Sequence, residues 1–380
     1  MDKFEQSFSA WLNCPYAFSF WKARVALYAI LRGLNIGDGD EVILPGYTCV
    51  MDVNPIKYVG AKPVYADIEP NTFNMVPDFV EEKITLRTKL IIAQHTYGYP
   101  CDMERILQIA QKHAIPVIED CCLALGSRYK GQLVGTFGRA AYFSFQWNKP
   151  FTTGLGGMAI TNDSGLAQKI ERLYAAEATE PSAKDVLMLA AQLAVYRAFI
   201  YPRTTALAQT LFRFLTRKGL VVGSSSSAEF VPSMPSGFFK GMSAVQARSG
   251  IKQLNKLEDN ICHRRKMADL YDHLLSEKGW PIRCYDKSVM DPVLVRYPVR
   301  IKQKQQALET AAAAGIELGS WFESPLHPQE TPLAAYDYTL GMCPEAEKAA
   351  AETVNLPLHP RAGEKTVRRT ADFISQFTPA

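Results

Sequence analysis

The chain has 380 residues, of which 47% are hydrophobic and 21% are charged, a balance typical of a globular protein with a sizeable core. Its 42 Lys and Arg against 38 Asp and Glu leave a net charge of +4, too small to indicate nucleic-acid binding. The composition also excludes a disordered, collagen-like or coiled-coil chain. The length favours two domains.

Eight cysteines are scattered along the chain, and no CxxC pair occurs among them. Adjacent Cys121 and Cys122 fit neither a disulfide framework nor a zinc site, and no set of His, Cys, Asp and Glu has metal-ligand spacing. The first residues contain acidic side chains and no apolar stretch typical of a secretory signal. We therefore expect a reduced, cytoplasmic protein without a metal.

Helical stretches alternate with short apolar runs from about residue 23 to 161. This cadence is typical of βα units, and it predicts an α/β fold with a mostly parallel central sheet. Ligands collect at the carboxyl ends of strands in such sheets, so the polar residues after each run are the candidates. The predicted helices are 23–34, 76–85 and 102–113, and the predicted strands are 41–45, 62–66, 89–94, 115–119, 140–145 and 157–161.

The segment 184–218 differs in composition, with six basic residues, one acidic residue and long apolar stretches. It is too interrupted to span a bilayer as one helix. Two interpretations stay open: a helical hairpin packed on its own subunit or a partner, and a peripheral membrane helix. A Gly-Ser loop follows at 223–227, and the chain becomes helical again over 244–275. We predict a large domain at 1–250, with a helical insertion at about 181–222, and a small α+β domain at 251–380.

Three segments that follow predicted strands carry chemically useful groups. Asp120 ends the run 115–119, Lys149 follows the run 140–145, and the glycine-rich segment 152–157 leads into the next strand. Taken singly, Asp120 is explained as a helix cap and Lys149 as a solvated lysine. Together they fit pyridoxal phosphate, which needs a lysine amine, a carboxylate for its ring nitrogen and donors for its phosphate.

The sequence resembles the DegT/StrS family of pyridoxal-phosphate-dependent nucleotide-sugar aminotransferases, which have the fold type I architecture. The resemblance runs through most of the chain, with the motifs in the family's order. Those motifs are GDGDEVILP at 37–45, GAKPV at 60–64 with DI at 67–68, HTYGYPCD at 95–102, VIED at 117–120, FSFQWNK at 143–149, MSAVQA at 242–247 and LPLH at 356–359.

The resemblance implies a two-step amino transfer, with glutamate as the usual donor and a nucleotide-linked keto sugar as acceptor. Lys149 would hold pyridoxal phosphate and act as the base, Asp120 would pair with its ring nitrogen, and Ser144 would bind its phosphate. Family members that dehydrate sugars replace this lysine, so Lys149 favours transamination. The resemblance also implies a homodimer and a role in polysaccharide or glycoside biosynthesis.

Several cofactor-binding positions depart from the family pattern. Lys22, Ala23 and Arg24 replace the usual Ser-Gly-Thr before the first helix, so either Arg24 or Lys22 binds the phosphate or both face solvent. Cys49 stands where the family often places an aromatic residue over the ring. Lys240 lies in the stretch that matches a loop reaching the partner subunit's site, where the family has an Asn and an Arg.

Three further residues are candidates for substrate contacts. His95 and Tyr97 follow the predicted strand 89–94, where His95 is about as well explained by a structural turn. His327 lies in a segment that resembles the family's nucleotide-sugar pocket.

Other functions remain open from the sequence. The first is an aminotransferase for a non-sugar ketone, such as a cyclitol or an aminobenzoate-type precursor. The second is a sensing protein that keeps the fold without catalysis, suggested by the altered phosphate motifs. A nicotinamide dehydrogenase is disfavoured because no GxGxxG follows the first strand.

Overall fold

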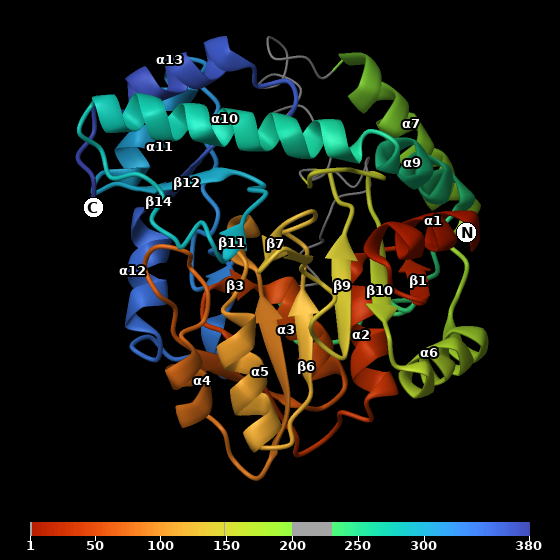
Figure 1. Cartoon of the computed structure of the whole chain (residues 1–380). Helices are drawn as coiled ribbons and strands as arrows, with labels where there is room; N and C mark the ends of the chain where they lie inside the picture. Colours follow the sequence, from red (N-terminus) through yellow and green to blue (C-terminus); the bar gives the residue numbers. More distant parts are fainter. Residues whose placement is uncertain (1, 148, 200–229) are drawn as a thin grey trace.

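The computed structural model of the chain describes residues 2–147, 149–199 and 230–380. A seven-stranded sheet lies at its centre, in the order β1-β10-β9-β6-β5-β2-β4 (Figure 1). The strands from β9 to β4 are parallel, whereas β10 is antiparallel to both of its neighbours. Their bounds are β1 Tyr16–Phe20, β2 Glu41–Pro45, β4 Lys62–Ala66, β5 Thr88–Gln94, β6 Val117–Asp120, β9 Ala140–Ser144 and β10 Gly157–Thr161.

The predicted α/β fold with a mostly parallel sheet is confirmed, and three strands match their predicted bounds: 41–45, 62–66 and 157–161. Strand β1 is an addition to the prediction. It pairs antiparallel with β10 at the edge of the sheet, so no helical crossover precedes it to mark it in the sequence.

The parallel strands are covered on both faces, which explains their continuous apolar runs. In β2, Val42 and Leu44 pack in the core that contains helix α2, Ala23–Gly33, while Ile43 packs in the core that contains helix α5, Met103–Lys112. Figure 1 shows α5 and the short helix α4, Pro77–Glu82, in front of the sheet and α2 behind it.

Helix α2 is the central helix of the rear layer. It packs against helix α3, Val50–Tyr58, helix α6, Ser164–Glu177, and strands β9 and β10. Gly157 permits this packing, because a Cβ atom there would lie 2.3 Å from the Cα atom of Ala23. The first turn of α2 is thereby held against the edge of the sheet where β9 ends and β10 begins.

Helix α3 was not predicted from the sequence. It contains Pro55, which removes one helical hydrogen bond, and Val and Asn, which have low helix propensity. Val50, Val53 and Ile56 are nevertheless fully buried, so packing stabilises the helix where propensity does not. This helix carries Asp52 in its first turn.

The carboxyl-terminal part combines helices with a two-stranded sheet. Strand β12, Tyr297–Arg300, pairs antiparallel with β14, Thr353–Leu356. The helix predicted over 244–275 is two helices, because the chain turns at Asn255 and Lys256. The helices here are α9 Ala244–Leu254, α10 Leu257–Glu277, α11 Lys304–Ala313, α12 Pro344–Glu352 and α13 Glu364–Ile374, with a 3-10 turn at Leu333–Tyr336.

Short strands connect the carboxyl-terminal part of the chain to the part before residue 150. Strand β13, Leu326–His327, pairs in parallel with β3, Thr48–Cys49, which places His327 directly beside Cys49. Strand β11, Met290–Asp291, pairs with β7, Arg128–Tyr129, which also pairs with β8, Gln132–Leu133. The predicted boundary near residue 250 stays a prediction.

Two further helices lie outside these layers. Helix α1, Asp2–Leu12, packs on β1 and α9. Helix α7, Ala183–Phe199, buries Leu189 and Leu193 but leaves Leu187 and Val195 exposed. Among the residues that the structure describes, no helix is long and apolar enough to cross a membrane. Residues 200–218 and the loop at 223–227 lie outside the described residues.

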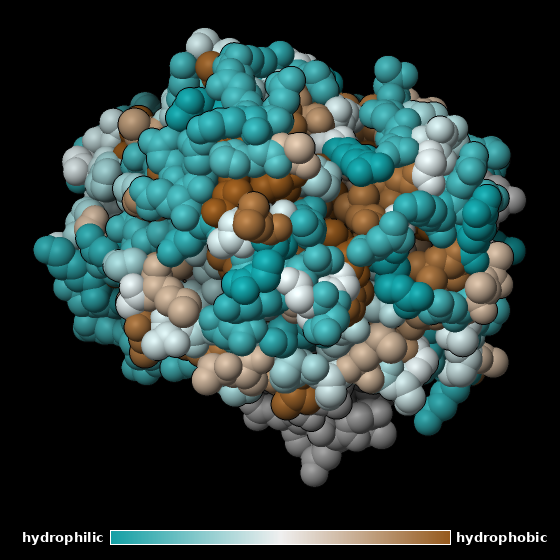
Figure 2. Space-filling view, turned by 90° about the horizontal axis from the view of Figure 1, so that it is seen from below, coloured by the Kyte–Doolittle hydropathy of each residue, from teal (hydrophilic) through white to brown (hydrophobic). Residues whose placement is uncertain are grey.

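Figure 2 shows the molecule from below. In Figure 1 the arrows of β5, β6 and β9 point upwards, so Figure 2 shows the side where these strands begin. Hydrophilic residues cover most of this face, with hydrophobic residues in groups between them. A shallow hollow of 470 Å³ lies near the amino ends of β5 and β6, lined by residues 84–86, 88–89 and 113–116. No predicted site residue lines this hollow; Asp120 and Ser144 instead end β6 and β9 at the opposite edge of the sheet.

Candidate active site

Asp120 is the last residue of β6 and lies at the carboxyl edge of the sheet. It is 3% exposed, and its Oδ1 atom accepts a hydrogen bond of 2.8 Å from the backbone N–H of Cys122. Burial raises the pKa of Asp120, and the nearby positive charge of Lys149 opposes that rise. The strand therefore places a buried carboxyl group where the charge of Lys149 acts on it.

Asp52, in the first turn of α3, lies close to Asp120 at the carboxyl edge of the sheet. One of its carboxyl oxygens lies within 4.8 Å of an Asp120 oxygen, and its Oδ1 accepts a hydrogen bond of 3.1 Å from the Tyr142 hydroxyl. Burial, followed by the charge of Asp120, raises the pKa of Asp52 to about 8. Sequence reasoning missed this residue, although Asp52 is the first acidic residue after the strand 41–45.

Two cations approach these carboxyl groups. The charges of Lys149 and Arg24 both act to lower the pKa values of Asp52 and Cys49. Arg24 is only 3% exposed in the first turn of α2, so it does not lie on the solvent side of that helix. Lys22 is the residue that precedes α2.

An aromatic side chain packs on Lys149, namely Trp321. It comes from a different part of the chain than position 49, where the family often has an aromatic residue and this chain has Cys49. The Lys149 Nζ atom lies 5.2 Å from the centre of the Trp321 ring. Cys49 is a partly buried thiol whose pKa rises to about 12, chiefly through burial. Sequence reasoning missed Trp321, because no local signal places residue 321 beside residue 149.

Ser144 and Ala23 meet at the same edge. Ser144 ends β9 and pairs with Gly157 across the sheet, and Gly157 in turn packs against the backbone of Ala23. The amino end of a helix attracts anions through its free N–H groups and its dipole. The hydroxyl of Ser144, the start of α2 and buried Arg24 therefore form a suitable set of donors for a phosphate.

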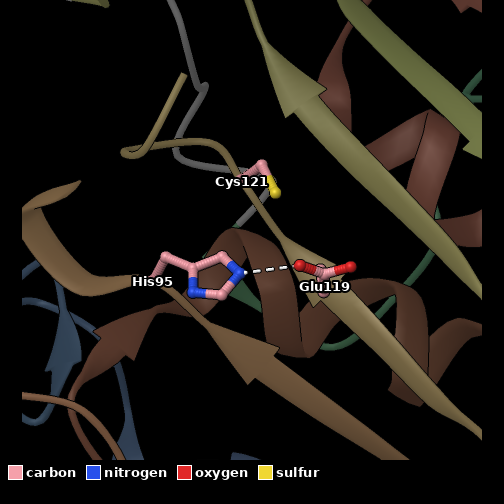
Figure 3. Close-up of side chains that lie close together, drawn as sticks. All are labelled: His95, Glu119 and Cys121. Carbon is pink, nitrogen blue, oxygen red and sulfur yellow. Dashed lines mark hydrogen bonds and ion pairs between the residues drawn. The ribbon is translucent and has the colours of Figure 1, made fainter. Parts of the chain in front are cut away.

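His95 belongs to a different, fully buried network. Its Nδ1 atom accepts a hydrogen bond of 3.0 Å from the backbone N–H of Cys101, so Nε2 carries the proton and points to Glu119 at 3.1 Å (Figure 3). The Sγ atom of Cys121 lies near this pair in Figure 3. Glu119 also accepts hydrogen bonds from the backbone N–H groups of Gly135, Phe137 and Gly138. Every ring nitrogen of His95 thus has a partner within the protein.

Tyr97 contacts Trp321, the residue whose ring lies over Lys149, and the charge of Lys149 acts on His327. The Tyr97 hydroxyl contacts the Tyr47 hydroxyl at 2.8 Å and the carbonyl of Trp321. The Nδ1 atom of His327 lies 3.8 Å from a Glu323 carboxyl oxygen, beyond hydrogen-bond distance. Burial lowers the pKa of His327 to about 4, so this ring is neutral near pH 7.

Lys240 does not join the cluster within a single chain. Its Nζ atom lies 3.5 Å from an Asp185 oxygen on α7. Its backbone carbonyl accepts a hydrogen bond of 3.0 Å from the N–H of Trp21, just before α2.

The side chains gathered here fit pyridoxal phosphate. Lys149 has a primary amine, Asp120 a buried carboxyl group, and the start of α2 carries buried Arg24, whose guanidinium has the chemistry to bind a phosphate. The fit rests on three elements that are distant in sequence, namely α2, the end of β6 and the loop after β9, and that converge at one edge of the sheet.

The chain is similar to known aminotransferases along most of its length. The DegT/DnrJ/EryC1/StrS aminotransferase family matches residues 1–189 and 203–375. The chain is 30% identical to the GDP-perosamine synthase of Caulobacter vibrioides, over 98% of this chain and 89% of that protein. It is 47% identical to the GDP-perosamine synthase of Escherichia coli O157:H7, where the match spans 44% of this chain and only 46% of that protein. The structure of DesV from S. venezuelae has a TM-score of 0.74 at 25% identity, over 99% of this chain and 88% of that one.

Proposed function

The chain belongs to the DegT/DnrJ/EryC1/StrS aminotransferase family and is a pyridoxal-phosphate-dependent aminotransferase, and we propose that its amino acceptor is a nucleotide-linked keto sugar. The names of the GDP-perosamine synthases support this acceptor class. The structural observation that supports a pyridoxal-phosphate site is that buried Asp120, at the carboxyl edge of the sheet, lies where the charge of Lys149 acts on it.

Each side chain in the cluster has a proposed task. Lys149 would hold the cofactor covalently through Nζ, and Asp120 would accept a hydrogen bond from the ring nitrogen. Arg24, Ser144 and the backbone N–H of Ala23 would bind the phosphate, where a guanidinium suits two phosphate oxygens at once. Lys22 and Cys49 border this site, at the start of α2 and at the end of β3.

When bound, pyridoxal phosphate supplies an electron-withdrawing ring that stabilises negative charge on the carbon that gains or loses the amino group. Once Nζ is free of the cofactor, Lys149 would remove a proton from the carbon on one side of the transferred nitrogen and deliver it to the carbon on the other side, acting first as base and then as acid. Asp120 would keep the ring nitrogen protonated. The Trp321 ring over Lys149 would limit the access of water to that amine.

For the substrate, His327 is the proposed contact from the carboxyl-terminal part of the chain. Its ring is neutral near pH 7, so it can donate one hydrogen bond and accept another from sugar hydroxyl groups. His95 and Tyr97 already have hydrogen-bond partners within the protein. We therefore propose that they affect substrate binding indirectly, by holding neighbouring residues of the site in position.

We further propose a cytoplasmic homodimer that takes its amino group from glutamate and serves polysaccharide or glycoside biosynthesis. In the dimer, Lys240 and its loop would complete the site of the second copy. Peripheral membrane contact through 184–218 is a separate possibility, and cosedimentation with anionic liposomes at low salt tests it. The absence of binding at low salt would remove it.

The decisive test is the visible absorption of the purified protein with added cofactor. Wild type should show the band of the lysine-bound cofactor, glutamate should bleach it, and Lys149→Ala should lack it. Lys266→Ala is the matched control, because Lys266 lies on the surface in an ion pair with Glu364 and should behave as wild type.

The acceptor is tested next, with the glutamate-treated protein. Return of the band with a GDP- or UDP-linked keto sugar supports the proposal. Return of the band with a cyclitol ketone alone would contradict the acceptor class. Absence of any band in folded wild-type protein would favour a non-catalytic role.

A further inference from the structure

Asp52 is a half-buried acid at the candidate site to which the proposed mechanism assigns no task. It reaches the carboxyl edge from helix α3 and shares this edge with Asp120, within 4.8 Å between carboxyl oxygens. Because Asp120 is buried and Asp52 is half-buried, two carboxylates this close cannot both ionise without an electrostatic cost. The position of Asp52 therefore bears directly on the charge of Asp120.

The hydrogen bonds around Asp52 indicate where a proton would sit. Gln94 donates from Nε2 to the carbonyl of Tyr47 at 3.0 Å, which fixes the orientation of its amide because a carbonyl can only accept. Its Oε1 atom therefore accepts from the hydroxyl of Thr48. Thr48 has a single hydroxyl hydrogen and uses it on Gln94.

The Oδ2 atom of Asp52 lies 3.5 Å from this same Thr48 oxygen. Since the Thr48 hydrogen points to Gln94, the contact is favourable only if Oδ2 itself carries a hydrogen. The Oδ1 atom is satisfied separately by the Tyr142 hydroxyl. A protonated Asp52 thus satisfies both contacts, while an ionised one leaves two oxygens facing each other without a hydrogen between them.

Electrostatics agree with this hydrogen-bond pattern. Burial and then the charge of Asp120 raise the pKa of Asp52 to about 8, even though the first turn of a helix favours an anion. The groups that face Asp52 from the packed elements are Arg24 on α2, Cys49 on β3, Asp120 and Cys122 at the end of β6, Tyr142 on β9 and Lys149 in the loop after β9.

We propose that Asp52 is a positioning residue that holds one proton beside Asp120, so that the two carboxyl groups together carry a single negative charge towards Lys149. The consequence for the cofactor rests on the proposed role of Asp120: the charge of the pair would then match one protonated ring nitrogen. Proton sharing itself is a property of the protein without cofactor, so the two parts can be tested separately.

The first test compares the apo protein with Asp52→Asn. The amide can accept from Tyr142 and donate towards Thr48, as the protonated acid does. Because the folded state holds a proton on Asp52 up to about pH 8 while an unfolded Asp releases it near pH 4, wild type loses stability as pH rises through this window. The unfolding midpoint of Asp52→Asn relative to wild type should therefore rise between about pH 4 and pH 8 and then level off.

Asp78→Asn is the matched control, since Asp78 is an exposed acid paired with Arg105 on the surface. Its midpoint relative to wild type should show no such rise over the same window. A flat difference for Asp52→Asn would overturn the proposal. If this variant does not fold, infrared difference spectra of wild-type apo protein between about pH 6 and pH 9 replace it, and a protonated carboxyl band that disappears at the higher pH is expected. Absence of that change would overturn the proposal as well.

The second test measures cofactor affinity by absorption at neutral pH. Asp52→Asn should bind pyridoxal phosphate within about twofold of wild type, because the amide replaces a neutral group. A loss of tenfold or more would show that Asp52 acts as an anion and would overturn the proposal. If Asp120→Asn also keeps full affinity while the apo pH series behaves as expected, proton sharing stands and the proposed role of Asp120 fails.

Discussion

Glu119 and Asp120 are neighbours in strand β6, and the structure treats their two carboxyl groups in opposite ways. Successive residues of a strand point to opposite faces of the sheet, so each acid meets a different layer. Glu119 is fully buried and receives hydrogen bonds from three backbone N–H groups and from His95 (Figure 3). Asp120 receives one backbone N–H bond and faces Asp52, another acid.

This contrast separates a structural acid from a chemically available one. The lone pairs of Glu119 are occupied by groups of the loop 135–138 and of the turn after β5, so it fastens those segments to the sheet. Among the residues that the structure describes, Asp120 accepts hydrogen bonds from Cys122, which leaves it further accepting capacity. A buried carboxyl group with unfilled capacity beside an amine is what a protonated ring nitrogen requires.

The largest predicted effect follows from removing the carboxyl group of Glu119, the acid whose hydrogen-bonding capacity is filled. Glu119→Ala would leave the buried backbone N–H group of Gly135, the partly buried N–H groups of Phe137 and Gly138, and the His95 ring without their acceptor. We expect the free energy of unfolding of the apo protein to fall by roughly 3 kcal/mol or more, since each unsatisfied buried donor carries its own desolvation cost. Urea denaturation followed by circular dichroism measures this change.

Glu104→Ala is the control for that experiment. Glu104 pairs with Lys130 at 2.6 Å, but both side chains are about half exposed. Its removal should change the free energy of unfolding by less than about 1 kcal/mol. An equally small effect of Glu119→Ala would show that the loop 135–138 does not depend on the carboxyl group.

The next prediction concerns the unsaturated member. Asp120→Asn removes an acid whose pKa is raised by burial, so the apo protein should keep or gain stability near neutral pH. Its affinity for pyridoxal phosphate should fall about tenfold or more, because an amide cannot hold the ring nitrogen in its protonated form. Absorption titration measures the affinity, and thermal unfolding of the apo protein measures the stability. Destabilisation as large as that of Glu119→Ala would erase the distinction between the two acids.

The sequence was enough to predict the strand that contains these acids, although the predicted range 115–119 begins two residues before β6, Val117–Asp120, and ends one residue short of it. The apolar runs at 41–45 and 62–66 match the parallel strands β2 and β4, and the run at 157–161 matches β10, which is antiparallel to its neighbours but also buried, because buried strands have mostly apolar sequences. Helix α3 gave no such signature, since its Pro55 and Val residues disfavour a helix in isolation and tertiary packing forms it.

The site was predictable only where its residues follow strands. Asp120 and Lys149 could be placed at one edge because parallel strands share a carboxyl side. Asp52 and Trp321 could not, because Asp52 depends on the unpredicted helix α3, and Trp321 comes from a loop distant in sequence. The same holds for His327, which reaches Cys49 only through the pairing of β13 with β3.

The smallest predicted effect sharpens the comparison at the Asp52–Asp120 pair. The Tyr142 hydroxyl donates to Asp52 and lowers its pKa, so Tyr142→Phe should raise that pKa further above about 8. Wild-type apo protein loses stability as pH rises to about 8. In Tyr142→Phe this loss should continue to a higher pH, and the upper end of the pH range should move by about one unit or less. Thermal unfolding across this range measures the shift.

Tyr129→Phe is the matched control, because the Tyr129 hydroxyl also donates to an acid, Asp102 at 2.9 Å, but outside the Asp52–Asp120 pair. A window that moves to lower pH in Tyr142→Phe, or moves equally in both variants, would mean that the hydroxyl of Tyr142 does not stabilise the ionised form of Asp52.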